Sequence, residues 1–119
     1  MSTPITLTFL PDEYKPLLDG QITATIRLGL DLKPGDKFYA GSTGLLCRIT
    51  SARRLSVGQA VTMHYRAMGF ASRNEALIRW HKLHPHIGHL LHHRVGFYRF
   101  EQVPDQTVPM HAKATAEVV

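Results

Sequence analysis

The sequence contains a single cysteine, Cys47, among its 119 residues. One thiol cannot form an internal disulfide framework or a cysteine-based zinc site, and this composition favours a cytoplasmic protein. The apolar runs are only a few residues long, far short of the roughly 20 residues that a membrane-spanning helix needs. The N-terminus alternates polar and apolar residues, so the sequence predicts no secretory signal peptide and no membrane partner.

Several motifs that carry chemistry are also missing. No glycine-rich phosphate loop, Gly-x-Ser-x-Gly nucleophile elbow or Cys/His nucleophile pair occurs, and nothing predicts a cofactor. Charged residues make up only 19% of the chain, whereas hydrophobic residues make up 44%. Because such a chain can bury a core, wholesale disorder is excluded. The length fits one ordinary domain.

Acidic residues are nearly absent from the middle of the chain. Residues 45–100 contain nine Lys and Arg but only one acid, Glu75, whereas residues 1–44 and 101–119 carry net charges of −1 and −2. The formal net charge of +5 therefore arises from a middle segment of +8. Such a segment attracts polyanions, because each Lys or Arg near a phosphate releases counterions. The alternative is a solvated basic face with no nucleic-acid role.

Apolar periodicity and turn residues predict an α+β domain over residues 1–103. Two capping boxes, at residues 56–59 and 72–75, mark the starts of two helices. The order of short strands and helices favours a mixed sheet that curls toward a small barrel. Residues 104–119 lack periodicity and are predicted to form a flexible C-terminal tail. The predicted strands are 4–10, 23–27, 37–40, 45–52 and 95–101, and the predicted helices are 11–20, 56–67 and 72–83.

Three short motifs occur in a fixed order along the chain. Residues 20–27 read Gly-Gln-Ile-Thr-Ala-Thr-Ile-Arg, residues 32–36 read Leu-Lys-Pro-Gly-Asp, and residues 68–72 read Met-Gly-Phe-Ala-Ser ahead of a helix and the strand at 95–101. Together they resemble the ASCH domains of the PUA-like superfamily, whose first motif is Gly-x-Lys-x-x-(Glu or Thr)-x-Arg. This resemblance implies a small ASCH-type curled sheet or barrel with flanking helices. It also implies a cleft beside the sheet that binds RNA or modified bases.

One branch of this family, the acetylcytidine amidohydrolases, uses the motif lysine, the motif threonine and a downstream glutamate in catalysis. Thr25 matches the threonine, but Ile22 stands at the lysine position and no acid stands at positions 67 or 68. A threonine hydroxyl without a neighbouring base or cation is a weak nucleophile, so the sequence disfavours this amidohydrolase chemistry. A hydrolase or ribonuclease that uses Thr25 with His64 as its base is kept as an alternative.

The leading hypothesis is binding of RNA or another single-stranded nucleic acid through a basic cleft. Arg27 can grip a phosphate with two parallel hydrogen bonds; alternatively, it pairs with Asp31 or Asp36 to fix a turn. Other basic residues can follow a phosphate backbone or stand as separate exposed side chains, and an exposed aromatic ring can stack on a base. A protein-interaction module with a basic face is a further alternative. The candidate residues are Thr23, Arg27, Lys33, Arg48, Arg53, Arg54, Arg94 and Tyr98.

Seven of the eight histidines lie between residues 64 and 93. His89 and His93 are four residues apart and could share one helical face, as pairs of zinc ligands do. However, no carboxylate occurs between Glu75 and Glu101 to act as a further ligand or to orient the imidazoles. A structural or exposed role is therefore favoured, and no metal site is predicted.

Overall fold

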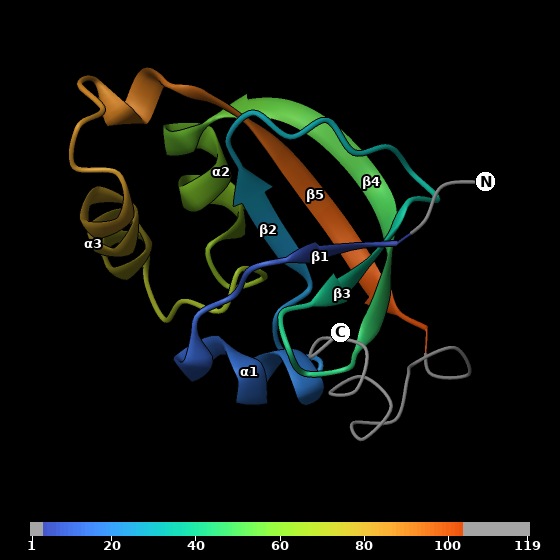
Figure 1. Cartoon of the computed structure of the whole chain (residues 1–119). Coiled ribbons are helices and arrows are strands. Elements are labelled where there is room, and N and C mark those ends of the chain that lie inside the picture. Colours follow the sequence, from blue (N-terminus) through green and yellow to red (C-terminus); the bar gives the residue numbers. More distant parts are fainter. Residues whose placement is uncertain (1–3, 104–119) are drawn as a thin grey trace.

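The structure, a computed structural model, describes residues 4–103 (Figure 1). The predicted tail, residues 104–119, lies outside the described residues. Among the helices that are described, none is long and apolar enough to cross a membrane. The elements are β1 (Ile5–Leu7), α1 (Pro11–Leu18), β2 (Ala24–Arg27), β3 (Lys37–Ala40), β4 (Leu46–Ser56), α2 (Val57–His64), α3 (Arg73–Leu83), a 3₁₀ turn (Leu90–His92) and β5 (Arg94–Gln102).

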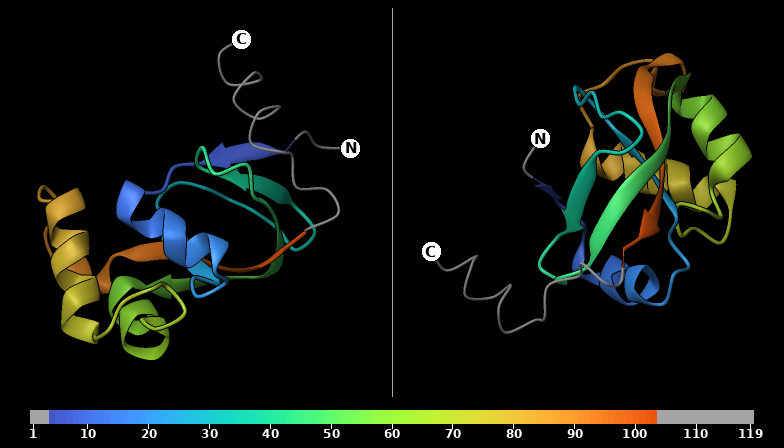
Figure 2. Two further views of the ribbon diagram at one scale, coloured as in Figure 1. Left: turned by 90° about the horizontal axis from the view of Figure 1, so that it is seen from below. Right: turned by 90° about the vertical axis from the view of Figure 1, so that its right-hand side faces the viewer.

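The five strands form one mixed sheet in the order β1-β3-β4-β5-β2. β1 runs parallel to β3, and all other neighbours are antiparallel. The pairing of β4 with β5 shifts register between Ile49 and Ser51, and such a bulge helps a strand to bend. The sheet curls strongly but stays open, with β1 and β2 at its edges (Figure 2). The predicted α+β class and curled mixed sheet are therefore confirmed, without closure into a barrel.

Two apolar clusters hold the elements together. The first lies inside the curl of the sheet and contains Phe38 and Phe100, whose rings meet edge to face with centroids 5.1 Å apart, together with Leu17 of α1. The second lies on the other side of the sheet, where Phe97 packs against α2 and α3. α2 and α3 lie together on one side of the molecule, whereas α1 lies below the sheet (Figures 1 and 2).

The serine-led helix starts are found where the sequence predicts them. Ser56 Oγ accepts a hydrogen bond from Gln59 N, and Ser72 Oγ accepts one from Glu75 N, both at 3.1 Å. The ends of three elements were predicted wrongly by three residues or more. β1 ends at Leu7 instead of residue 10, α2 ends at His64 instead of residue 67, and β4 continues to Ser56 instead of ending at residue 52. The strand continues through the polar pair at 53–54 because both residues stay in register with β5, and their exposed side chains need no apolar partner.

Candidate functional site

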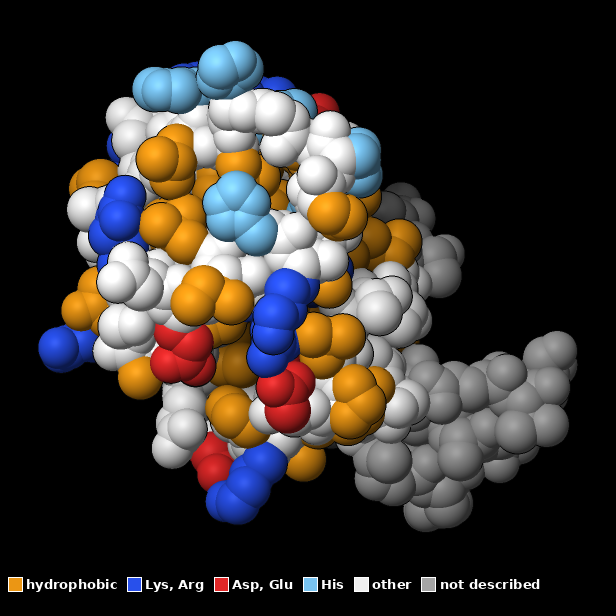
Figure 3. Space-filling model, turned by 90° about the vertical axis from the view of Figure 1, so that its left-hand side faces the viewer, with side chains coloured by type: hydrophobic (Ala, Val, Ile, Leu, Met, Phe, Trp, Pro, Cys, Tyr) orange, Lys and Arg blue, Asp and Glu red, His pale blue; other side chains and the backbone are white. Residues whose placement is uncertain are grey.

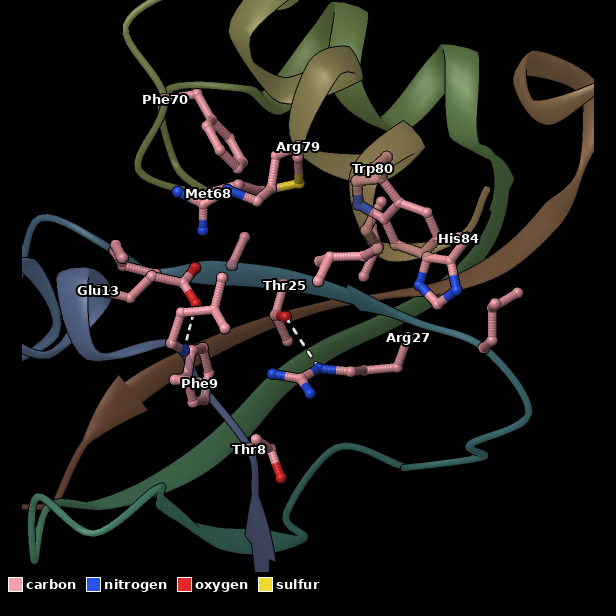
Figure 4. A pocket seen from close by; sticks show the side chains of 16 residues that line it. Thr8, Phe9, Glu13, Thr25, Arg27, Met68, Phe70, Arg79, Trp80 and His84 are labelled. Atoms are coloured by element: carbon pink, nitrogen blue, oxygen red, sulfur yellow. Dashed lines mark hydrogen bonds between the residues drawn. The ribbon is translucent and has the colours of Figure 1, made fainter. Parts of the chain in front are cut away.

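A cleft of about 380 Å³ lies beside the free edge of β2 (Figure 4). This volume is within the range of roughly 300–1,000 Å³ that is typical of small-molecule sites. Residues 24–28 form one side of the cleft, residues 8–10 with Glu13 form the second, and α3 with the segment before it forms the third. On the molecular face that carries α3, apolar side chains are mixed with separate charged ones, and histidines gather toward one end (Figure 3).

Arg27 projects into the cleft from β2, on the same face of the strand as Thr25, because strand side chains alternate between faces. Its Nε donates a hydrogen bond to Thr25 Oγ1 at 3.2 Å, and its Cζ lies 4.7 Å from the centroid of the Phe9 ring. Burial lowers the pKa of Arg27, and the nearby Glu13 carboxylate partly opposes this shift. The alternative pairing with Asp31 or Asp36 is not observed.

A second guanidinium reaches the cleft from α3. Arg79 Nη2 donates to Asp12 Oδ2 at 2.7 Å, and this hydrogen bond raises the pKa of Arg79. Its Nη1 is buried and has no hydrogen-bond partner within residues 4–103. Glu13, which accepts a hydrogen bond from Leu10 N at 2.8 Å, lies between Arg79 and Arg27 in the cleft (Figure 4). The cleft therefore presents one carboxylate between two guanidinium groups.

Ile22, at the position of the family lysine, forms part of the apolar wall. It packs so closely on Gly69 that a Cβ at residue 69 would lie 2.7 Å from Ile22 Cγ1. Gly69 also has a φ of +94°, so both its conformation and this contact require glycine. The cleft lacks a cation from position 22, but Arg79 brings one to the same cleft from a different element.

The side of the cleft that α3 forms carries two aromatic rings, those of Trp80 and His84. Trp80 is only 7% exposed and stacks on the ring of His84, with centroids 4.5 Å apart and planes 28° apart. Burial lowers the pKa of His84, and so do the neighbouring His86 and His93. His84 therefore favours the neutral imidazole, which can both donate and accept a hydrogen bond.

The structure brings only two of the predicted site residues, Thr25 and Arg27, into the cleft. Arg48 instead pairs with Glu101 across the β4–β5 ladder, and Arg94 Nη2 contacts the backbone oxygen of Arg54 at 3.4 Å. The predicted nucleic-acid-binding residues that do not line the cleft are Thr23, Lys33, Arg48, Arg53, Arg54, Arg94 and Tyr98.

Tyr98 does not offer the exposed base-stacking ring that the sequence predicts. Its side chain is only 3% exposed because it points into the curl of the sheet. The hydroxyl donates to the backbone oxygen of Leu30 and accepts from Leu32 N at 3.1 Å. Tyr98 therefore anchors the segment between β2 and β3.

His64, the proposed catalytic base, lies away from Thr25. Its ring stacks on Phe97, with centroids 4.3 Å apart, whereas Thr25 lies opposite Tyr98 in the β2–β5 ladder. Because neighbouring residues of a strand point to opposite faces, Thr25 and His64 lie on opposite sides of the sheet and do not form a nucleophile–base pair. Burial lowers the pKa of His64, and so do Arg99, whose Nη2 is 3.1 Å from Nδ1, and Arg53.

Sequence reasoning missed Glu13, Arg79 and His84 as cleft residues. Glu13 lies in the first turn of α1, where an acid suits the positive end of the helix dipole, and it also contributes a carboxylate to the cleft. Arg79 directly precedes the buried Trp80 on α3, and this position beside the apolar stripe was the available signal. In the part of the chain that the structure describes, no three His, Cys, Asp or Glu side chains converge as metal ligands do.

Known proteins resemble this chain in structure. No family model matches it, and no curated protein matches it significantly. Hypothetical protein PH0355 is 14% identical to this chain, with a TM-score of 0.68. The match covers 85% of this chain and 100% of the PH0355 chain. The ASCH domain of Lactobacillus crispatus is 15% identical with a TM-score of 0.57, covering 82% and 78% of the two chains. Protein PF0455 of Pyrococcus furiosus is 13% identical with a TM-score of 0.58, covering 84% and 96%.

These similarities extend over most of the chain and include a named ASCH domain. A second ASCH protein, from Zymomonas mobilis, is 11% identical with a TM-score of 0.57 and covers 81% of this chain and 65% of its own. The three motifs that resemble this family contribute β2, the turn before β3 and the segment before α3. The chain therefore has an ASCH-type fold.

Proposed function

We propose that this chain binds RNA or another single-stranded nucleic acid and holds one nucleotide in the cleft beside β2. The observation that carries the proposal is the placement of Arg27. Thr25 and Phe9 fix its guanidinium, while its two terminal nitrogens have no hydrogen-bond partner among the described residues. A guanidinium held in this way can bind a phosphate with little further loss of side-chain freedom.

The lining of the cleft supports a nucleotide as the ligand. Apolar and aromatic side chains surround a few polar groups, which is the usual composition of sites for small planar ligands. The indole of Trp80 and the ring of Phe9 lie on different sides of the cleft and contribute to its apolar lining (Figure 4). Glu13 and Arg79 add an acceptor and donors for polar groups of the ligand.

Exposed arginines outside the cleft support a longer ligand. Arg53 and Arg54 are both exposed near the end of β4. We assign them to sequence-independent contacts with phosphates, which would strengthen binding mainly at low salt. Arg48 contributes less in this proposal because Glu101 already neutralises it.

Fluorescence anisotropy with short labelled RNA and DNA at two salt concentrations tests this proposal. Arg27→Gln should weaken binding at least tenfold, because it removes a charge-assisted contact inside the cleft. Lys15→Gln is the matched control, since it removes one positive charge from an exposed site outside the cleft. It should change affinity little.

The double variant Arg53→Gln/Arg54→Gln tests the outer contacts. It should reduce the slope of log affinity against log salt by roughly 1.4, because each lost phosphate contact on a single strand removes about 0.7. Binding that is undetectable at tens of micromolar protein, or that does not depend on salt, contradicts the proposed function. Equal loss of affinity in the Arg27 and Lys15 variants contradicts the role of the cleft.

A further inference from the structure

The backbone of β2 borders the cleft along a free edge. β2 pairs with β5 on one side and has no neighbouring strand on the other. Five consecutive residues, 24–28, line the cleft, although the side chains of adjacent strand residues point to opposite faces. A continuous run of strand residues lines a single cavity when the cavity runs along the edge of the strand. Figure 4 agrees, because β2 crosses the view with Trp80 on one side and Arg27 on the other.

The pairing pattern shows which backbone groups face the cleft. Phe100 N donates to the backbone oxygen of Thr23 at 3.0 Å, which sets the phase of the β2–β5 ladder. In an antiparallel ladder, alternate residues direct their N–H and C=O toward the partner strand. Thr25 therefore points its backbone groups toward β5, whereas Ala24 and Ile26 point theirs toward the cleft. At the start of the strand, Thr23 N and Ala24 N both donate to the backbone oxygen of Ala67, at 2.8 and 3.1 Å, so Ala24 N is already satisfied.

Three backbone groups remain available along this edge. They are Ala24 C=O, Ile26 N–H and Ile26 C=O, and none has a hydrogen-bond partner in the described part of the chain. In order along the strand they form a row of acceptor, donor and acceptor. A buried or half-buried row of this kind requires a polar ligand or water, because unsatisfied backbone groups are costly.

We propose that this free edge of β2 reads the Watson–Crick edge of an unpaired nucleobase. Each nucleobase presents an N–H donor beside a ring nitrogen or carbonyl acceptor on that edge. Ala24 C=O accepts from the base donor, and Ile26 N–H donates to the neighbouring acceptor. The inference rests on the proposed function and deepens it, because a base that is paired in a duplex cannot offer this edge.

An extended peptide is a poorer fit to the same edge. Adding a peptide strand requires a long row of free backbone groups, as in other cases of strand addition. Here the row of free backbone groups covers only residues 24–26. The Arg79–Asp12 ion pair also joins α3 to α1 beside the cleft, which limits the room for an extended chain. The cleft volume of about 380 Å³ suits a single planar group, and the basic segment 45–100 favours an anionic ligand.

Amide NMR of the 15N-labelled protein tests this inference. The four ribonucleoside 5′-monophosphates are titrated separately, with ribose 5-phosphate as the control that lacks a base. The Ile26 amide should shift and exchange more slowly with solvent when a nucleotide binds, whereas the Thr25 amide, already in the β5 ladder, should keep its exchange rate. Ribose 5-phosphate should perturb the Arg27 side chain but leave the Ile26 amide unchanged.

The outcomes separate this inference from the proposed function. Nucleotides or RNA that bind without any response of the Ile26 amide overturn the base readout but leave nucleic-acid binding intact. An equal Ile26 response to ribose 5-phosphate, or to a peptide of alternating Val and Thr, also overturns it. If neither nucleotides nor RNA bind, both proposals fail.

Proline substitution gives a second, independent test. Ile26→Pro removes the N–H that faces the cleft and shortens the side chain, but it leaves the N–H groups of the β5 ladder in place, and proline is tolerated on edge strands at such positions. Ile26→Val is the matched control, because it also shortens the side chain but keeps the N–H. RNA affinity of the proline variant should be roughly tenfold lower than that of the valine variant. If both variants fold and bind RNA with equal affinity, the proposal is contradicted. If the proline variant does not fold, the NMR experiment remains the deciding test.

Discussion

His64 is a half-buried imidazole surrounded by positive charge. Its ring stacks on Phe97, Arg99 contacts its Nδ1, and Arg53 lies close enough to affect its titration. Desolvation and these two arginines lower its pKa in the folded state. Below the ordinary histidine pKa of about 6.5, the unfolded chain therefore binds a proton at this position more readily than the folded protein does.

This shift predicts that the protein loses stability as the pH falls from about 6.5 toward the lowered pKa of folded His64. His64→Phe keeps a ring on Phe97 but removes the titration, so its melting temperature should fall less between pH 7 and pH 5. Thermal denaturation at several pH values measures the effect. His92→Phe, at an exposed position, is the control. A parallel pH dependence of the His64 variant and the wild type would count against this explanation.

At the scale of single residues, the sequence could place Thr25 and Arg27 together because both lie on one strand, two positions apart. It could not show that Glu13 and Arg79 join them, since Glu13 lies on α1 and Arg79 lies on α3, 66 positions later in the chain. The sequence also could not show that the Tyr98 side chain is buried. The side chains of adjacent Phe97 and Tyr98 point to opposite faces of β5, and both are buried because an apolar cluster covers each face.

At the scale of elements, α3 is the helix that builds one wall of the cleft. It contributes the guanidinium of Arg79 and the indole of Trp80. Its first turn depends on Ser72, whose hydroxyl accepts from Glu75 N. This cap satisfies one of the N–H groups that every helix start leaves without an internal partner.

Ser72→Ala should lower the free energy of unfolding by about 1 kcal/mol, because alanine cannot replace the cap. Urea denaturation measures the change. Ser72→Asp is the matched control, since aspartate is an equally good cap and also suits the positive end of the helix dipole. Alanine and aspartate variants of the same stability would contradict the assigned role of the hydroxyl.

The elements themselves were largely predictable from local patterns. Capping residues located the starts of α2 and α3, and apolar periodicity together with turn residues located the five strands. The neighbours of each strand could not be predicted, because the parallel pairing of β1 with β3 and the pairing of β2 with β5 join segments far apart in the chain. Such pairings depend on how the whole core packs, so they cannot be predicted from local sequence patterns.

At the scale of the whole molecule, Tyr98 links the long β5 strand to the segment between β2 and β3. Its hydroxyl bonds to the backbone of Leu30 and Leu32, more than 60 residues away in the sequence. The ring also lies over Gly96, where a Cβ would be 2.4 Å from the hydroxyl oxygen. One side chain therefore fixes the position of a complete connecting segment.

Tyr98→Phe should lower the free energy of unfolding by about 1–3 kcal/mol, because it leaves the buried Leu32 N–H without an acceptor. Amide exchange should also become faster in residues 28–36 than elsewhere. Urea denaturation and hydrogen exchange measure the two effects. Tyr65→Phe is the control, since the Tyr65 hydroxyl has no partner among the described residues. A uniform change in exchange over the whole domain would contradict the proposed anchor.

The ion pair between Arg79 and Asp12 joins α3 to the first turn of α1, and so connects two walls of the cleft. Asp12 is 63% exposed, and surface ion pairs of this kind contribute only about 0–1 kcal/mol and weaken as salt is added. This ion pair therefore holds the two walls together only weakly. If the cleft holds a ligand as we propose, we expect the weakened connection to let that ligand leave sooner, so that higher ionic strength shortens the residence time even of an uncharged ligand.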